Sequence, residues 1–344
     1  MKSIRKICFA IIGCGHIGKK YADILTNGSV PYAKLLGVCD SIKEKADNIS
    51  NQFGGSSFSN MHQMMKEIGE KIDVVCILTE SGYHAKNLFE LVSYKKDFLV
   101  EKPLGMNQIE CFRMIEEVEK KGNRLFVVKQ NRYNPLVKSV KETLENKVLG
   151  EIFLASFRLR CCRSQEYYDE AAWRGTKKLD GGVLSNQAIH YIDLLQWYMG
   201  MPNSVYAEGF LFGSEIEMED TAVAIFHFPS GAIGTLEATT AVRPKNLEGS
   251  IDLLGSKGSA LIRGESLNYL EMRYLDGNKY VDVYDGNKQF IYKNGHVDYL
   301  NEVTQVILKN EKPKIDGYMA IKSIQILDAL YKSIRTKQRI QLCI

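Results

Sequence analysis

A glycine-rich turn near the N-terminus constrains this chain more than any other feature. The apolar run at residues 7–12 leads directly into the segment Gly13-Cys14-Gly15-His16-Ile17-Gly18, and an amphipathic pattern follows it. After a strand, the first glycine permits a tight turn, the second lets a phosphate approach the backbone, and the third lets the next helix pack closely. The free N–H groups that begin such a helix bind a pyrophosphate. Because strand, turn and helix occur in this order, the segment predicts a dinucleotide site contacted by Gly13, Gly15, His16, Ile17 and Gly18.

The end of the second predicted strand indicates which dinucleotide binds. Asp40 follows the apolar run at residues 34–39. A carboxylate at this place accepts hydrogen bonds from the adenosine ribose hydroxyls and repels a ribose phosphate. In the alternative interpretation, Asp40 only caps the helix expected after Ser41, since aspartate is a favoured cap. We expect Asp40 to bind the ribose, and NAD to be the cofactor.

The first 130 residues alternate short apolar runs with amphipathic helical patterns. The expected strands are Lys6–Ile12, Lys34–Cys39, Val74–Leu78, Phe98–Glu101 and Leu125–Val128. Strands that are apolar throughout and alternate with helices form a parallel sheet covered on both faces. We therefore expect an α/β protein in which residues 1–130 form a doubly wound Rossmann domain.

The pattern changes after Pro135. A strand is expected at Ile152–Arg160 and a helix at about Leu184–Met199; from Val205 to about Tyr292, strand follows strand with short turns between them. Such a succession forms an antiparallel or mixed sheet. We expect residues 131–344 to form an α+β domain with a large, mostly antiparallel open sheet that binds substrate. Because an open sheet needs cover, we also expect a homo-oligomer, either a dimer or a tetramer.

Composition excludes several classes of protein. Of 344 residues 45% are hydrophobic, and the net charge of +4 is far from the dense basic stripe that nucleic acid requires. No apolar stretch is as long as a membrane span, and the early glycines interrupt any region like a signal peptide. The eight cysteines and six histidines show no spacing typical of metal ligands. We expect a cytoplasmic protein that binds no metal, nucleic acid or membrane.

Lys102 is the first candidate for the chemistry. It lies in the segment Glu101-Lys102-Pro103, directly after a predicted buried strand. In an open parallel sheet, the carboxyl ends of the strands face the ligand. A lysine beside a cationic nicotinamide loses proton affinity and can then help to move a hydroxyl proton. The alternative is a surface ion pair between Glu101 and Lys102, and the sequence favours neither.

A second polar cluster follows the pair Gly181-Gly182. On a continuous helix Asn186, His190 and Asp193 share one face, because they are four and three residues apart. His190 could then relay a proton, Asp193 orient its ring, and Asn186 bind a substrate hydroxyl. The alternative is a core histidine paired with Asp193. Three aligned polar groups favour the functional interpretation.

Taken together, these motifs resemble the Gfo/Idh/MocA oxidoreductase family over essentially the whole chain. The resemblance also includes Thr79 and His84 after the predicted strand at Val74–Leu78. It implies that Lys102 and His190 flank the reacting carbon. With it, the expected cofactor contacts extend to Thr79, His84, Glu101, Lys102 and Gln130. Three positions depart from the family pattern: Asn186 and Ala188 stand where Asp and Gly are frequent, and Glu80 stands where Pro often follows the threonine. An amide cannot act as acid or base, so we expect His190 and Lys102 to transfer the proton.

The segments 130–135 and 185–197 resemble the subgroup that oxidises UDP-linked N-acetylglucosaminuronic acid at its third carbon, for surface polysaccharides. A basic segment rich in aromatic residues, between Arg158 and Lys178, agrees with an anionic nucleotide sugar, because guanidinium groups suit diphosphate and carboxylate. For any single residue of that segment, a solvated loop is the alternative. The expected substrate contacts are Lys102, Asn131, Arg132, Tyr133, Arg163, Trp173, Arg174, Asn186, Gln187 and His190, with Arg132 and Arg174 foremost.

Other functions remain open at this point. Within the enzyme class, the substrate could be a free sugar, inositol or UDP-N-acetylglucosamine. From another class, the chain could be a non-catalytic NAD-binding sensor, although such a sensor needs neither Lys102 nor His190.

Overall fold

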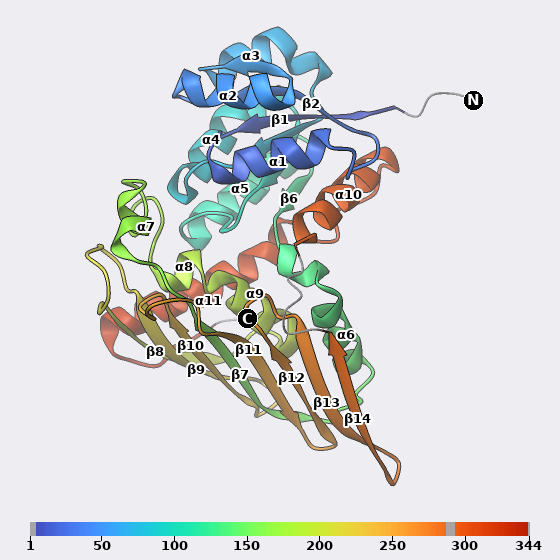
Figure 1. Ribbon diagram of the computed structural model, residues 1–344, viewed down its shortest axis with the longest axis vertical. Coiled ribbons are helices and arrows are strands. Elements are labelled where there is room, and N and C mark those ends of the chain that lie inside the picture. Colours follow the sequence, from blue (N-terminus) through green and yellow to red (C-terminus); the bar gives the residue numbers. More distant parts are fainter. Residues whose placement is uncertain (1–4, 287–292, 343–344) are drawn as a thin grey trace. The chain divides into compact units, whose positions relative to one another are not determined.

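The computed structural model describes residues 5–286 and 293–342, and these residues group into two compact units (Figure 1). The first unit contains residues up to 130 together with 296–321. The second contains residues 131–295 and 322–344. We describe each unit by itself.

The first unit is built on a six-stranded parallel sheet in the order β3-β2-β1-β4-β5-β6. Its strands are β1 (Ile7–Ile12), β2 (Ala33–Cys39), β3 (Ser56–Phe58), β4 (Val74–Ile77), β5 (Asp97–Val100) and β6 (Leu125–Val127). Its helices are α1 (His16–Thr26), α2 (Lys43–Phe53), α3 (Met61–Ile68), α4 (His84–Leu91), α5 (Gln108–Lys120) and α10 (Gly295–Leu308). This confirms the predicted doubly wound sheet. The short β3 was not predicted, because only one of its three residues is apolar.

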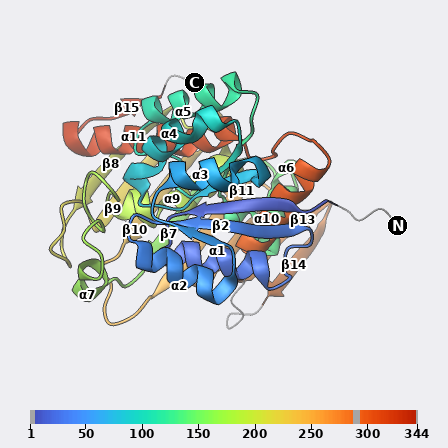
Figure 2. The same cartoon turned by 90° about the horizontal axis from the view of Figure 1, so that it is seen from above.

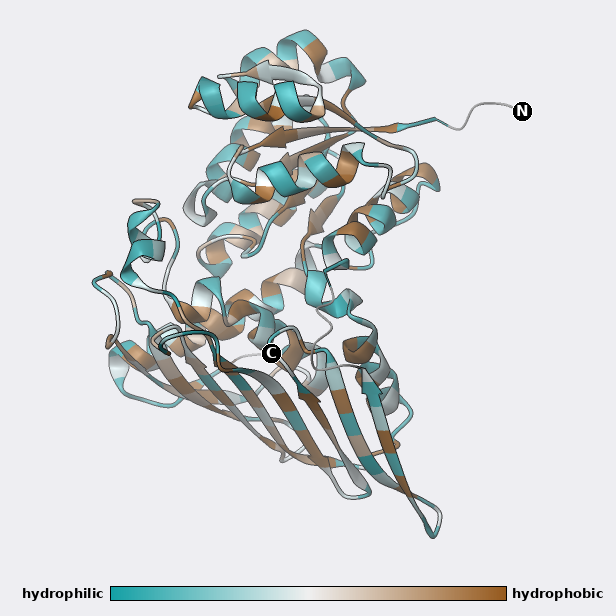
Figure 3. Cartoon of the chain, in the orientation of Figure 1, coloured by the Kyte–Doolittle hydropathy of each residue, from teal (hydrophilic) through white to brown (hydrophobic). Residues whose placement is uncertain are grey.

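Burial explains why the central strands are continuous apolar runs. Every residue of β4 and β5 is buried, and hydrophobic colours dominate the middle of this sheet (Figure 3). Figure 2 shows α1 and α2 on one side of β1 and β2, and α4 and α5 on the other. A sheet covered on both faces leaves no place for polar side chains except at the strand ends. The polar residues that end the strands therefore line the carboxyl edge of the sheet.

The second unit is built on a nine-stranded sheet in the order β14-β13-β12-β11-β7-β10-β9-β8-β15. All neighbours are antiparallel except β7 and β10, which are parallel, so the predicted mostly antiparallel sheet is confirmed. The strands are β7 (Ile152–Arg160), β8 (Ser204–Phe210), β9 (Thr221–His227), β10 (Ile233–Thr239), β11 (Glu248–Gly255), β12 (Gly258–Arg263), β13 (Tyr269–Asp276), β14 (Lys279–Gly286) and β15 (Ile340–Gln341). The last predicted stretch of strand, up to Tyr292, lies outside the described residues.

Helices cover one face of this second sheet (Figure 1). They are α6 (Pro135–Glu145), α7 (Gln165–Asp169), α8 (Val183–Asn186), α9 (Ile189–Met199) and the larger part of α11 (Gly317–Thr336). Burial alternates along β9: Ala222 and Ala224 are buried, whereas Val223 and Ile225 between them are 50% and 42% exposed. The second face is thus open to solvent and carries apolar side chains.

The return of residues 296–321 to the first unit differs from the expectation that all of 131–344 form one domain. Asn301 of α10 donates to the carbonyl of Ser29, and Tyr318 donates to Glu119 of α5. The side chain of Arg124 donates to the carbonyl of Glu311 and, through a second nitrogen, to Asn310. A helical period in the sequence shows which face of a helix is apolar but does not indicate which sheet it covers.

Candidate active site

The glycine turn has the geometry that the sequence predicts. Gly13 has a φ of 97°, and a Cβ there would lie 2.6 Å from the carbonyl carbon of Leu78. A Cβ on Gly18 would lie 2.1 Å from the carbonyl oxygen of Gly13, whereas one on Gly15 would meet open space. No side chain caps the start of α1, where the exposed His16 and the half-buried Ile17 follow Gly15. Open space in front of uncapped N–H groups fits a pyrophosphate.

Asp40 ends β2 beside this turn, and its carboxylate holds two backbone groups. One oxygen accepts from the N–H of Cys14 at 2.8 Å, and the other accepts from the N–H of Ile42 at 2.9 Å. Ile42 is the residue before α2, and among the described residues no side chain caps that helix, so Asp40 holds the loop that leads into α2 rather than capping it. Each carboxylate oxygen has a second lone pair, and the residue is only half-buried, so ribose hydroxyls can still bind.

Thr79 and His84 connect the ends of β4 and β5. The Thr79 hydroxyl accepts from Asn87 of α4 at 2.9 Å. The two ring nitrogens of His84 face the carbonyl oxygens of Pro103 and Thr79 at 2.8 and 3.0 Å, and the side chain is 1% exposed. Burial lowers the pKa of His84, so the ring is neutral and donates to one of these carbonyls. His84 thus links the ends of β4 and β5 through one such hydrogen bond, and its contact with the cofactor stays a prediction.

Glu101 is also buried, and its carboxylate has internal partners. Oε1 accepts from the Tyr21 hydroxyl at 3.1 Å and faces Nε2 of His296 at 3.4 Å; Oε2 accepts from the N–H of Lys102 at 3.0 Å. Burial alone would raise the pKa of Glu101, but the bond and charge of His296 and the charge of Lys102 lower it to about 2. Glu101 therefore stays ionised. Its carboxylate holds neighbouring groups of the protein, and a direct contact of Glu101 with the cofactor stays a prediction.

Lys102 lies at the carboxyl edge of the sheet, half-buried and directly after β5. Sequence reasoning assigned no role to His296, which opens α10 and is 7% exposed next to Glu101. Because it lies almost 200 residues from Glu101 in the chain, nothing in the sequence indicated that the two side chains meet.

Gln130 follows β6 at the start of a short 3₁₀ turn, η4 (Gln130–Tyr133), and is half-buried, as is Asn131.

In the second unit the predicted helix at Leu184–Met199 is interrupted. It forms two helices, α8 and α9, and the N–H of Ala188 bonds the carbonyl of Val183, five residues back. This wider turn removes Asn186 from the face that His190 and Asp193 share on α9. The expectation of three residues on one helical face is therefore wrong for Asn186. Asp193 as the residue that orients His190 stays a prediction.

Asn186 instead belongs to a chain of polar side chains. Its amide donates to Asp180, and its oxygen accepts from Gln187 at 3.0 Å. The oxygen of Gln187 accepts from Arg163 at 3.3 Å, and Asp180 also accepts from the N–H of Gly175 at 2.7 Å. Three expected substrate residues are thus brought together. Sequence reasoning missed Asp180, although an aspartate directly before the glycine pair was a usable signal.

Arg132 and Asp193 form a buried ion pair. Nε and Nη2 of Arg132 each bond one carboxylate oxygen at 2.8 Å, and both side chains are 4% exposed. The guanidinium also lies over the ring of Trp197, with 5.2 Å to its centre. Tyr133 is buried beneath Lys138. The charge of Arg132 is thus neutralised inside the second unit, and its expected contact with substrate stays a prediction.

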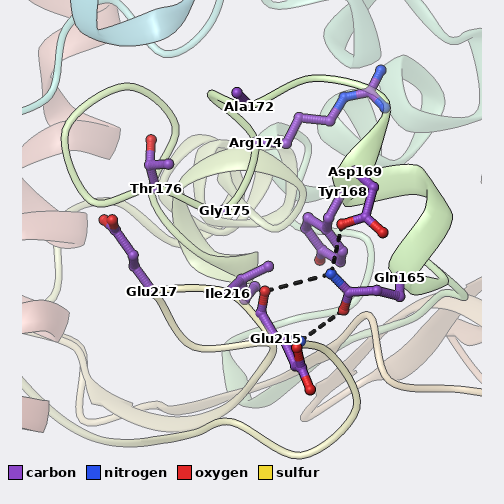
Figure 4. A pocket seen from close by; sticks show the side chains of 10 residues that line it. All are labelled: Gln165, Tyr168, Asp169, Ala172, Arg174, Gly175, Thr176, Glu215, Ile216 and Glu217. Atoms are coloured by element: carbon purple, nitrogen blue, oxygen red, sulfur yellow. Dashed lines mark hydrogen bonds between the residues drawn. The ribbon is translucent and has the colours of Figure 1, made fainter.

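Two more expected substrate residues, Trp173 and Arg174, follow α7 in the chain. The guanidinium of Arg174 lies 4.1 Å from the ring centre of Tyr167 and 5.9 Å from that of Trp173, and it pairs with Glu170 at 2.8 Å. A pocket of about 580 Å³ next to it is lined by the ten residues in Figure 4. Three of these are the carboxylates of Asp169, Glu215 and Glu217. An anionic diphosphate does not fit such a lining.

No group of three or more potential metal-ligating side chains occurs among residues 5–286 and 293–342. Within the same ranges, no helix has the length and apolar character needed to cross a membrane.

Comparisons with known proteins agree with this geometry. Residues 7–129 match the oxidoreductase family with an NAD-binding Rossmann fold, and residues 137–261 match the GFO/IDH/MocA C-terminal domain. The chain is 33% identical to the WlbA dehydrogenase from Bordetella pertussis, solved with NADH and UDP-GlcNAcA; the match covers 99% of this chain and 100% of that one, with a TM-score of 0.88.

Two further relatives cover nearly the whole chain. The WlbA dehydrogenase from Chromobacterium violaceum, also solved with NADH and UDP-GlcNAcA, is 30% identical over 99% of this chain and 97% of that one, with a TM-score of 0.87. A myo-inositol 2-dehydrogenase from Thermotoga maritima is 23% identical over 96% of this chain and 97% of that protein. The chain belongs to the Gfo/Idh/MocA family and is an NAD-dependent sugar or polyol oxidoreductase.

Proposed function

We propose that this enzyme oxidises the 3-hydroxyl of a UDP-linked N-acetylhexosaminuronic acid to the 3-keto sugar, in the biosynthesis of a surface polysaccharide. One observation carries the proposal. Two relatives that are at least 30% identical over nearly the whole chain were both solved with UDP-GlcNAcA, whereas two inositol dehydrogenases are 23% and 24% identical.

The reaction needs a hydride acceptor and a proton acceptor. NAD⁺ supplies the first: the C3–H bond breaks, its electron pair leaves with the hydrogen, and NADH forms. The hydroxyl proton goes to His190 of the second unit or Lys102 of the first, and the C3–O bond becomes a carbonyl. The side chain of Asn186 is an amide, which is not basic enough to take the proton. It donates a hydrogen bond to Asp180 and so positions its neighbours. General-base transfer of this kind contributes roughly 10²- to 10⁴-fold to a rate.

The proposed cofactor contacts are Gly13, Gly15, His16, Ile17, Gly18 and Asp40, with Thr79, Lys102 and Gln130 near the nicotinamide. For the substrate, the chain of Arg163, Gln187 and Asn186 replaces Arg132 as the leading candidate. Arg163 has a part-exposed guanidinium that can bind a carboxylate or phosphate, and Gln187 and Asn186 suit sugar hydroxyls and amides. Asn131, Trp173 and Arg174 remain further candidates.

A homo-oligomer remains part of the proposal. The open face of the second sheet exposes Phe153, Val223, Ile225 and Ile233. Apolar side chains gathered on an open sheet are typical of a surface that another subunit covers.

A polyol or simple sugar is the second candidate substrate, because the inositol dehydrogenases also match at least 96% of the chain. The test is NADH formation by the purified enzyme with UDP-N-acetylglucosaminuronic acid, UDP-N-acetylglucosamine and myo-inositol. Single-turnover measurements are included, because NADH that stays bound would hide activity at steady state. Reduction of NAD⁺ only with the uronic acid supports the proposal; reduction only with inositol overturns it.

The proton carriers are tested with the substrate that the panel identifies. His190→Ala and Lys102→Ala should each lower kcat by at least about 100-fold, with NAD⁺ binding retained. A His190→Ala enzyme with normal turnover would exclude His190 as the proton acceptor.

A further inference from the structure

We propose that His296 is a positioning residue for Lys102, acting through the carboxylate of Glu101. The inference rests on the proposed catalytic role of Lys102 and adds a third segment of the first unit to the site. None of the sequence motifs includes His296.

Three distant parts of the first unit meet at Glu101. Lys20 and Tyr21 come from α1, the helix that begins at the glycine turn; Glu101 follows β5; His296 opens α10. The Tyr21 hydroxyl and Nε2 of His296 face the same oxygen, Oε1, and the two rings meet edge to face at 5.8 Å. Nζ of Lys20 lies 3.1 Å from Nδ1 of His296.

The hydrogen-bond partners determine where the ring proton of His296 lies. An ammonium group can only donate, so Nδ1 accepts from Lys20 and the proton of a neutral ring is on Nε2. Nε2 then faces Oε1 of the Glu101 carboxylate at 3.4 Å. The same carboxylate accepts from the Tyr21 hydroxyl and from the N–H of Lys102. The array therefore anchors the Glu101 side chain.

The anchor acts on Lys102 through the main chain. While Oε1 is held by Tyr21 and His296, Oε2 accepts from the N–H of Lys102 at 3.0 Å. The orientation of the Glu101 side chain thus determines the position of the peptide that carries Lys102. Loss of the His296 donor would let the carboxylate turn, and displacements of about 1 Å at a catalytic group can lower rates about 100-fold.

The test compares His296→Leu, His296→Gln and Lys20→Met in the full-length enzyme. His296→Leu should lower kcat between about 10- and 100-fold, with NAD⁺ affinity changed less than about threefold. His296→Gln keeps an N–H donor and should recover most of the loss. Lys20→Met removes only the donor to Nδ1 of His296, so kcat should decrease a few fold. This variant takes the place of His296→Leu in the comparison if the leucine variant does not fold.

A double-mutant cycle shows whether His296 acts through Glu101. In the Glu101→Gln enzyme, the further substitution His296→Leu should change kcat by less than about twofold, because the carboxylate through which His296 acts is already absent. If each substitution instead lowers kcat by the same factor whether or not the other is present, the proposal is overturned. Asn301→Ala is the matched control, since Asn301 lies on the same helix and bonds Ser29 instead.

Hydrogen exchange at the Lys102 amide gives a readout that needs no substrate. Exchange should be at least about tenfold faster in His296→Leu than in the wild type, and unchanged in Asn301→Ala. Unchanged exchange in His296→Leu, or faster exchange with normal kcat, overturns the inference. If Lys102→Ala itself retains turnover, the proposed catalytic role of Lys102 fails instead, and the two failures are thereby distinguished.

Discussion

At the scale of single residues, the site depends on charged groups whose partners lie inside the protein. Asp40 holds the N–H groups of Cys14 and Ile42, Glu101 holds the N–H of Lys102, and Arg132 is paired with Asp193. Sequence patterns singled these residues out as candidate site residues. They could not show whether a charge faces a ligand or a neighbouring segment, because that depends on contacts between residues far apart in the chain.

Substitution of Asp40 separates its two functions. In Asp40→Ala, NAD⁺ should bind at least about tenfold more weakly, equivalent to about 1.4 kcal/mol. NADP⁺ should lose less affinity or gain some, because the carboxylate that repels a ribose phosphate is gone. Fluorescence titration with both cofactors measures the ratio of the two dissociation constants. A purely structural role for Asp40 would leave that ratio at its wild-type value.

The Arg132–Asp193 pair should behave as a buried ion pair. Arg132→Met leaves the Asp193 carboxylate buried without its cation, which should lower the free energy of unfolding by about 3–5 kcal/mol. The double variant Arg132→Met/Asp193→Leu removes both charges and should recover most of that loss. Urea unfolding measures both changes. A single variant as stable as the wild type would instead favour the predicted role of Arg132 in binding substrate.

At the scale of elements, the break between α8 and α9 is the feature that sequence periodicity missed. The residues around the break are apolar enough to form one continuous helix. The turn at α8 is instead fixed by Asp180, Gly181 and Gly182, which directly precede it. Glu219 contributes as well: it accepts from the N–H of Leu184 at 3.1 Å and from the Tyr331 hydroxyl at 3.1 Å. A Cβ on Gly182 would lie 2.3 Å from the Glu219 carboxyl carbon. Long strands and helices were predictable because their periods are local, whereas this break depends on a residue 35 positions away.

Glu219 makes stability depend on pH. Burial raises the pKa of Glu219 to about 7, and Asp220 adds to this, while its hydrogen bonds oppose it. Between the ordinary glutamate pKa, near 4.3, and 7, the folded state binds more protons than the unfolded state, so stability falls as pH rises. Glu219→Gln, which cannot ionise, should gain about 2–3 kcal/mol over the wild type between pH 5 and pH 8. Thermal unfolding of both proteins at both pH values measures the difference in stability between the variant and the wild type. If that difference is the same at pH 5 and pH 8, the raised pKa of Glu219 is contradicted.

At the scale of the whole molecule, the two-part architecture was predictable and the path of the chain was not. The parallel and antiparallel sheets follow from local patterns of apolar residues. The return of residues 296–321 to the first unit follows from contacts of single side chains, such as Arg124 and Tyr318, that no local pattern shows. The same return brings His296 to Glu101, so the unpredicted part of the fold also supplies an unpredicted part of the site.

Arg124 links this returning segment to the sheet of the first unit. It pairs with Asp97 at 2.9 Å, with side chains 23% and 10% exposed, and it also bonds the carbonyl of Glu311. Arg124→Ala should therefore lower the free energy of unfolding by about 2 kcal/mol, less than a fully buried pair would cost. The matched control is Arg5→Ala: Arg5 pairs with Asp73 on the same unit, but its side chain is 71% exposed, so the cost should stay below about 1 kcal/mol. Urea unfolding of the full-length protein compares the two variants. Equal losses would mean that the contacts of Arg124 with residues 310 and 311 contribute nothing, and that the apolar face of α10 alone holds the segment in place.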